Sequence, residues 1–172
     1  MLTDIIYNVF RKTPSVFHYF SLASDILVYG SVFLFYVFWV YIAVKQKRIN
    51  WIFVIELTLG LFIAFSLTGW IKSVYPEIRP ISYYSSDSAQ LFDSFPSRHT
   101  AVAATLAILI LPSYFELGAG LVAISILVGI LRWFSLMHWP IDIITGWFLG
   151  MLIAIFVNEI TKLILKLKYN KK

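Results

Sequence analysis

The chain has 172 residues, of which 60% are hydrophobic, and its 14 Lys and Arg against 9 Asp and Glu give a net charge of +5. A soluble domain would carry about 25% charged residues, whereas this chain carries 13% and has a mean hydropathy of +0.82. These values exclude a water-soluble globule and a nucleic-acid-binding module, and the absence of cysteine excludes disulfides and thiolate metal sites.

Residues 1–21 are predicted to form a helix that lies in the membrane interface rather than a span. The apolar residues of this segment follow the spacing of an amphipathic helix, namely Leu2, Ile5, Ile6, Val9 and Phe10. The polar residues fall elsewhere on the helical wheel, as expected for a helix with one face in the headgroup region.

The remainder of the chain has room for about five transmembrane helices of about 20 residues each. The predicted spans are Leu22 to Val44, Trp51 to Ile71, Ser97 to Leu111, Leu117 to Ser135 and Pro140 to Leu165. The predicted fold class is therefore all-α, a polytopic transmembrane helical bundle formed by one domain over residues 1–172. Gly146 and Gly150 form a small-xxx-small pair in the last span, which predicts close helix packing.

The distribution of Lys and Arg predicts the orientation of the bundle, because short cytoplasmic loops are enriched in these residues. Eight cations fall on one side: Lys45, Lys47, Arg48, Lys162, Lys166, Lys168, Lys171 and Lys172. That side is predicted to be cytoplasmic, which places the amino terminus outside. The cations of the carboxy-terminal tail also suit anionic lipids of the inner leaflet.

The opposite, outer ends of the spans collect residues typical of a phosphoryl-transfer site. Lys72, Arg79 and Arg132 could surround a phosphoryl group, with Arg supplying bidentate hydrogen bonds. Ser97 is predicted to cap the third span, whose free N–H groups would face the same anion.

Two histidines on this outer side suit acid–base and nucleophilic chemistry. His138 and Asp142 are four residues apart at a helix start, so the carboxylate can hold one imidazole nitrogen and leave the other free to attack. His99 would then be free to protonate the leaving oxygen. His18 lies far from these motifs in sequence, and we assign it no catalytic role.

Three segments in this order resemble the signature of the type 2 phosphatidic acid phosphatase superfamily. They are Lys72-x6-Arg79-Pro80, then Pro96-Ser97-x-His99, then Arg132-x5-His138-x3-Asp142. Two positions depart from the family pattern: Arg98 stands where the family usually has Gly, and Leu131 stands where it usually has Ser before the motif arginine. Arg98 could contact a second phosphate or a sugar headgroup, or simply face water.

The resemblance implies metal-independent phosphate ester hydrolysis, without a cofactor, through a phosphohistidine intermediate. It makes His138 the nucleophile, Asp142 the residue that orients it, and His99 the general acid. It assigns phosphate binding to a further four residues, Lys72, Arg79, Ser97 and Arg132.

The resulting hypothesis is an integral membrane lipid phosphatase with its active site on the outer, periplasmic face of the cytoplasmic (inner) membrane. The favoured substrate is lipid A 1-phosphate, with undecaprenyl diphosphate and phosphatidylglycerophosphate as alternatives. A lipid-headgroup transporter or binding protein is the non-enzyme alternative, and the vanadium haloperoxidases, which share the signature, are disfavoured because they are soluble. Residues 81–95 form a solvated loop or a lid beside the site. The sequence does not determine the oligomeric state.

Overall fold

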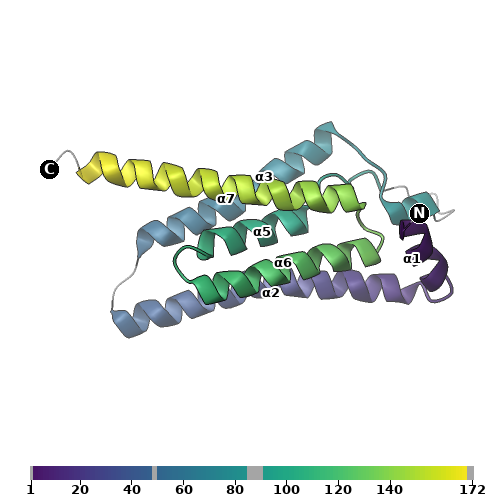
Figure 1. Cartoon of the computed structure of the whole chain (residues 1–172), viewed down its shortest axis with the longest axis horizontal. Helices are drawn as coiled ribbons and strands as arrows, with labels where there is room; N and C mark the ends of the chain where they lie inside the picture. The colour runs from purple at the N-terminus through teal and green to yellow at the C-terminus, as the bar shows by residue number, and fades with distance from the viewer. Residues whose placement is uncertain (1, 48–49, 85–90, 170–172) are drawn as a thin grey trace.

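The computed structural model describes residues 2–47, 50–84 and 91–169, and these residues are almost entirely helical (Figure 1). The helices are α1 (Leu2–Phe10), α2 (Ser15–Gln46), α3 (Trp51–Val74), α4 (Pro80–Tyr84), α5 (Arg98–Ile110), α6 (Phe115–Phe134) and α7 (Pro140–Tyr169). The predicted polytopic helical bundle is confirmed. The lid prediction falls partly on residues 85–90, and part of the basic tail on residues 170–172, which lie outside the described residues.

Four helices, α2, α3, α6 and α7, are long and apolar enough to span a membrane. The predicted third span forms α5, which has only 13 residues. At 1.5 Å per residue α5 is about 20 Å long, less than the hydrocarbon thickness of about 30 Å. The predicted third span is therefore a shorter apolar helix, enclosed by the four long ones.

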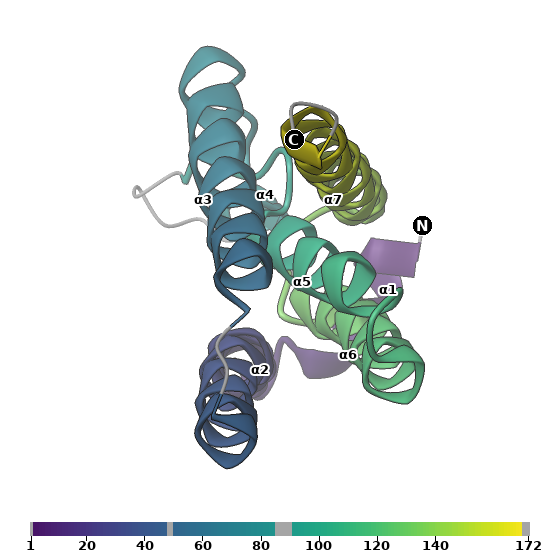
Figure 2. The ribbon, with the colours of Figure 1, turned by 90° about the vertical axis from the view of Figure 1, so that its left-hand side faces the viewer.

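Helix α5 is the centre of the bundle. Figure 2 shows it surrounded by α3, α6 and α7, the helices with which it makes its most extensive contacts. Ten of its 13 residues are buried, and small side chains such as Ala101 and Ala104 let the neighbouring helices approach.

The predicted glycine pair forms the contact between α5 and α7. A Cβ atom added at Gly146 would overlap the carbonyl oxygen of Ser97, and one added at Gly150 would overlap that of Ala101. The small-xxx-small prediction is therefore confirmed as a packing feature, and it fixes the start of α5 against the start of α7.

The amino-terminal segment differs from the single interfacial helix predicted over residues 1–21. Helix α1 ends at Phe10 and α2 begins at Ser15, so residues 15–21 belong to the first long helix. Pro14 directly precedes α2, a position where its fixed φ and missing N–H are tolerated. The residues with the amphipathic pattern nevertheless form helix α1, in which Ile6 is buried while Leu2 and Val9 are exposed.

The two ends of the bundle carry different groups of cations. Helices α1 and α4 and the α6–α7 loop lie together at the right-hand end of Figure 1, whereas α2 and α7 end on the left. Lys45 is in the last turn of α2, and Lys162 pairs with Glu159 at 2.7 Å toward the end of α7. The described members of the predicted cytoplasmic cation set thus lie away from the motif residues.

Candidate active site

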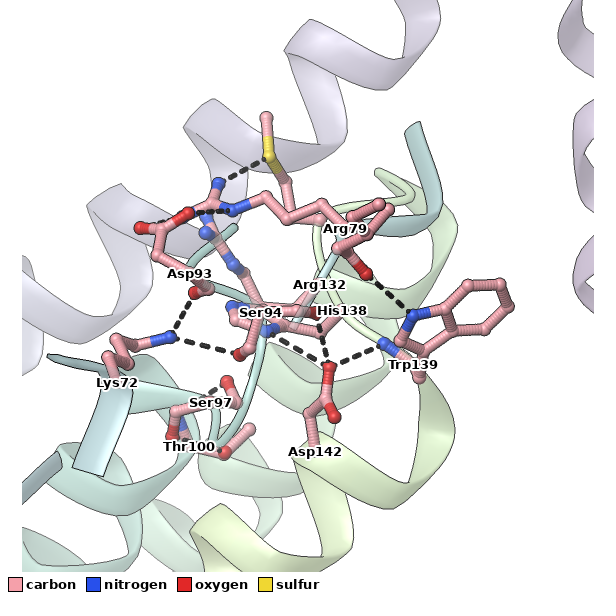
Figure 3. A network of polar contacts seen from close by, with 12 residues as sticks. Lys72, Arg79, Asp93, Ser94, Ser97, Thr100, Arg132, His138, Trp139 and Asp142 are labelled. Carbon is pink, nitrogen blue, oxygen red and sulfur yellow. Dashed lines mark hydrogen bonds and ion pairs between the residues drawn. The ribbon is translucent and has the colours of Figure 1, made fainter. Parts of the chain in front are cut away.

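The predicted site residues come from several helix ends that meet at one end of the bundle. Lys72 is in the last turn of α3 and Arg132 in the last turn of α6, while Ser97 precedes α5 and Asp142 is in the first turn of α7. His138 lies in the loop between α6 and α7. Figure 3 shows the side chains of these residues gathered around one small region.

His138 and Asp142 form a buried pair. Nδ1 of His138 lies 3.5 Å from Oδ2 of Asp142, and the two side chains are 2% and 0% exposed. The same Oδ2 accepts hydrogen bonds from Ser94 Oγ (2.5 Å) and from the backbone N–H of Trp139 (2.8 Å). With these two donors the carboxylate is fixed, so it can orient the imidazole through Nδ1.

Burial is the main influence on the protonation of His138. It lowers the pKa of the imidazole, an effect that Asp142 opposes and that the positive charges of Arg132 and Lys72 reinforce. The pKa therefore lies below the ordinary histidine value, and the imidazole is neutral at neutral pH. A neutral imidazole is the form that can act as a nucleophile.

The turn before His138 has an unusual backbone conformation. Leu136 has a φ of 55°, in the left-handed region that a bulky side chain rarely adopts. Its side chain is fully buried in a cluster with Ile6 and Phe17, and its carbonyl accepts a hydrogen bond from the N–H of Ile81 (2.8 Å). Packing from α1, α2 and α4 thus compensates the strain and positions the loop that carries His138.

Ser97 caps α5, as predicted from the sequence. Its Oγ accepts from the N–H of Thr100 at 3.5 Å, and its own N–H donates to the carbonyl of Asp142 at 3.0 Å. The start of α5 is therefore tied to the start of α7, and the partial positive charge of the α5 N-terminus lies beside the His138–Asp142 pair.

Arg79 and Lys72 are both bound to the segment that precedes the second motif. Arg79 makes a bidentate pair with Asp93, from Nε to Oδ1 and from Nη2 to Oδ2, each at 2.7 Å. Lys72 Nζ donates to the backbone carbonyls of Ser94 (2.9 Å) and Asp93. Burial alone would raise the pKa of Asp93, but its hydrogen bonds and charge pairing with Arg79 outweigh this and hold the pKa below its ordinary value.

Arg132 and His99 meet at one carboxylate, that of Asp25 in α2. Asp25 Oδ1 lies 3.1 Å from Arg132 Nη1 and 2.9 Å from His99 Nε2. Arg132 Nη1 also lies within hydrogen-bond distance of the hydroxyl oxygens of Ser21 (3.1 Å) and Ser24 (3.3 Å). Arg132 is only 4% exposed, so these contacts stabilise, through Nη1, a charge that is largely removed from solvent, while its buried Nε has no hydrogen-bond partner among the described residues.

Arg98 turns toward α3. Its Cζ lies 4.3 Å from the centroid of the Phe65 ring, a cation–π geometry. Nη2 approaches Gly69, where an added Cβ would lie 3.1 Å from it. Arg98 and His99 also line the polar end of an apolar groove of about 290 Å³ between α2, α3 and α5, whose other lining residues are Val28, Tyr29, Val32, Leu61, Phe62, Phe65 and Val102.

Among residues 2–47, 50–84 and 91–169, no group of three or more His, Asp or Glu side chains is arranged to hold a metal ion. The charged and titratable side chains that meet around the motif residues include cations, two histidines and the carboxylates that contact them. Such a set is suited to binding an anion and to transferring a proton.

The motif residues fall inside a match to a known family. The model of the PAP2 superfamily matches residues 53–165, about two thirds of the chain. The chain belongs to the PAP2 superfamily. The expected family is therefore confirmed, and the matched region runs from α3 to α7.

A curated relative and two solved structures are similar to this chain. An undecaprenyl-diphosphatase of Sulfolobus acidocaldarius is 29% identical over 113 residues, which cover 62% of this chain and 54% of that protein. The chain thus spans about half the length of this curated relative.

The crystal structure of Aquifex aeolicus LpxE matches with a TM-score of 0.62 and 24% identity, covering 92% of this chain and 93% of that one. The first transmembrane PAP2-type phosphatidylglycerolphosphate phosphatase from Bacillus subtilis matches with a TM-score of 0.53 and 17% identity, covering 94% and 92%. At these identities the two structures establish the fold alone. The four long apolar helices of this PAP2 chain are those expected of an integral membrane protein.

Among the residues outside the PAP2 motifs that contact motif side chains, Asp25, Asp93 and Ser94 were not predicted as site residues from the sequence. Asp93 and Ser94 lie in the stretch that was interpreted as a solvated loop or lid, yet they contact Arg79 and Asp142. Asp25 is the only acidic residue of the 32-residue helix α2. An isolated carboxylate in an apolar helix is a signal of function, and it could have identified this residue.

Proposed function

We propose that this PAP2 protein is a membrane phosphatase that hydrolyses the terminal phosphate of a lipid phosphate or diphosphate. The observation that carries the proposal is the buried His138–Asp142 pair at the helix ends that also supply Lys72, Arg79 and Arg132. Three cations and the start of α5 can neutralise the charge that develops on a transferred phosphoryl group.

The proposed reaction has two steps. In the first, the free nitrogen of neutral His138 attacks phosphorus, an N–P bond forms, the P–O bond to the lipid breaks, and His99 donates a proton to the leaving oxygen. In the second, His99 accepts a proton from water as the water oxygen attacks phosphorus. The N–P bond then breaks, which releases inorganic phosphate and restores neutral His138. Asp142 stabilises the positive charge on the imidazole in the intermediate.

A lipid substrate suits the surroundings of the site. The groove between α2, α3 and α5 is lined by apolar side chains and ends at Arg98 and His99. An acyl or prenyl chain could lie there while the headgroup phosphate reaches the cations. We place the site on the outer face of the inner membrane because the described cations of the orienting set lie at the opposite end.

Lipid A 1-phosphate is the substrate that we favour, on the sequence resemblance to that compact group. Undecaprenyl diphosphate is the main alternative, supported by the similarity to the Sulfolobus enzyme, and phosphatidylglycerophosphate is the third. Because all three present a terminal phosphate on a large amphiphile, we expect rates to depend more on the headgroup than on the tail.

The decisive experiment is phosphate release by the purified protein in detergent, with EDTA present and the three lipids offered side by side. Release from at least one of them, faster than from a short-chain soluble phosphate ester, supports the proposal. Saturable binding of these lipids without any release would instead support a headgroup-binding or transport protein. Equal rates on soluble and long-chain esters would contradict the proposed use of the apolar groove.

Asp93→Asn is expected to strengthen phosphate binding. Asp93 occupies both donor groups of Arg79 that a phosphate would use, and its side chain is 51% exposed. Since an exposed ion pair contributes about 0.2–1 kcal/mol, the inhibition constant of inorganic phosphate should fall by up to about fivefold. Glu116→Gln, at the other end of α6, is the control and should leave that constant unchanged. If the inhibition constant of phosphate is unchanged or higher in Asp93→Asn, Asp93 does not compete with phosphate for Arg79.

The acid side of the pH profile is expected to lie below the ordinary histidine range. His138 must be neutral to attack, and its pKa is lowered by burial, so kcat/KM should persist as the pH falls through about 6.5 and decline only at lower pH. The substrate phosphate itself ionises near pH 6, and this ionisation is measured in a separate experiment by the 31P chemical shift of the substrate. Because Asp142 raises the pKa of His138, Asp142→Asn should move the decline further down. If kcat/KM still declines near pH 6.5 after allowance for the ionisation of the substrate, the prediction is contradicted.

A further inference from the structure

We infer that Asp25 is a positioning residue for the general acid, so that the site contains a second aspartate–histidine pair. The inference rests on the proposed function, because it gives a role to a contact of His99. None of the three PAP2 motifs lies in α2, yet α2 supplies this carboxylate.

The imidazole of His99 is held by α2 at two points. Asp25 Oδ1 lies 2.9 Å from its Nε2. Tyr29, one helical turn further along α2, contacts the ring edge-on, with centroids 5.7 Å apart. Because Asp25 and Tyr29 are four residues apart they lie on the same face of the helix. Helix α2 therefore determines both the position of the ring and which nitrogen is engaged.

This contact assigns different roles to the two nitrogens of His99. A carboxylate at Nε2 favours a proton on that nitrogen. Nδ1 is then the nitrogen that donates its proton to the leaving oxygen. After the transfer, neutral His99 keeps its Nε2–H on Asp25, and Nδ1 takes a proton from the attacking water in the second step. The arrangement mirrors the His138–Asp142 pair, in which the carboxylate lies at Nδ1.

A simpler role for Asp25 would be that of counterion to Arg132, which lies 3.1 Å from the same oxygen. A charged residue in an apolar helix does need a partner. Ser21 allows the two roles to be separated, because its hydroxyl contacts Arg132 Nη1 and no contact joins it to His99 in the described part of the chain. Loss of the Ser21 hydroxyl perturbs Arg132 alone, whereas loss of the Asp25 charge perturbs Arg132 and His99 together.

The test compares two substrates that differ in their need for a general acid. A lipid alkyl phosphate needs protonation of its leaving oxygen, whereas p-nitrophenyl phosphate releases a phenolate that leaves without it. If Asp25 positions the acid, Asp25→Asn should lower kcat on the lipid by about 100-fold, which is within the range for general acid catalysis. The same variant should lower kcat on the aryl ester by less than about fivefold, because that reaction does not need the acid. Ser21→Ala should change both substrates by the same factor.

The outcomes separate this inference from the proposed function. If Asp25→Asn lowers both rates equally, as Ser21→Ala does, then Asp25 is a counterion only and the inference is overturned. If the unmodified protein releases phosphate from neither substrate, the proposed function fails and the inference fails with it.

A measurement on the unmodified protein covers the case in which Asp25→Asn does not fold. The chain has three histidines, so 15N NMR of histidine-labelled protein can assign His99 by its loss in His99→Gln. We expect a protonated Nε2 at His99. An unprotonated Nε2 would overturn the inference.

Discussion

Replacing His138 by alanine is expected to lower kcat on a lipid phosphate by about 1,000-fold or more, because the covalent step loses its nucleophile. The side chain is 2% exposed and held against Asp142, and among the described residues no other histidine is paired with a buried carboxylate. The measurement combines phosphate release with alkaline gels of protein that was exposed to 32P-labelled lipid and quenched in alkaline detergent, because a phosphohistidine is lost in acid. Label should appear in the unmodified protein and be absent from the variant.

The matched control is His18→Ala. His18 lies early in α2, where its ring contacts that of its neighbour Tyr19. The exchange removes the same side chain, and kcat should stay within about twofold of the unmodified protein, as is usual for substitutions away from a site. If His138→Ala keeps more than a tenth of the activity, or if label remains on it, His138 is not the nucleophile.

Replacing Gly146 by alanine is expected to lower both stability and activity. The new Cβ would overlap the carbonyl of Ser97 and the hydroxyl of Thr100, so α5 and α7 must move apart. Such overpacking costs about 1–3 kcal/mol, which corresponds to a fall in Tm of about 3–10 °C for a chain of this size. Because Ser97 and Asp142 are joined across this contact, kcat should fall as well.

Gly120→Ala provides the control in an exposed helix position. A Cβ added at Gly120 meets nothing within 4 Å, and alanine favours a helix over glycine by about 1 kcal/mol. Its Tm in detergent should therefore be unchanged or higher. Equal melting temperatures for the two variants would contradict the assignment of Gly146 to the α5–α7 contact.

The sequence predicted those parts of the site whose residues are close together in the chain. The His138–Asp142 spacing places both side chains at one helix start, and Ser97 is an N-cap that local chemistry specifies. The all-helical fold followed from composition, since backbone polar groups in a membrane must be satisfied internally. Helix ends were less certain: α2 begins at Ser15 rather than Leu22, because apolar residues before the predicted span continue the helix.

The contacts that could not be predicted from the sequence join residues far apart in the chain. Asp25 is 107 residues from Arg132, and nothing in local spacing specifies that they meet. The same limit applies to Arg98, whose departure from the family pattern suggested a headgroup contact or exposure to water. In the structure it lies over Phe65 of α3, a partner that only the packing of α3 against α5 provides. Its role toward a headgroup stays a prediction.

The pairing of charges in the resting site has a consequence for how a substrate arrives. Arg79 faces Asp93 and Arg132 faces Asp25, each at about 3 Å, so the field of each pair declines much faster with distance than that of a lone cation. Salt in the surrounding water screens the remainder within about 10 Å. An anion dissolved in water is therefore attracted only weakly toward the site. A lipid has no need of such attraction, because diffusion in the plane of the bilayer brings its phosphate to the level of the helix ends.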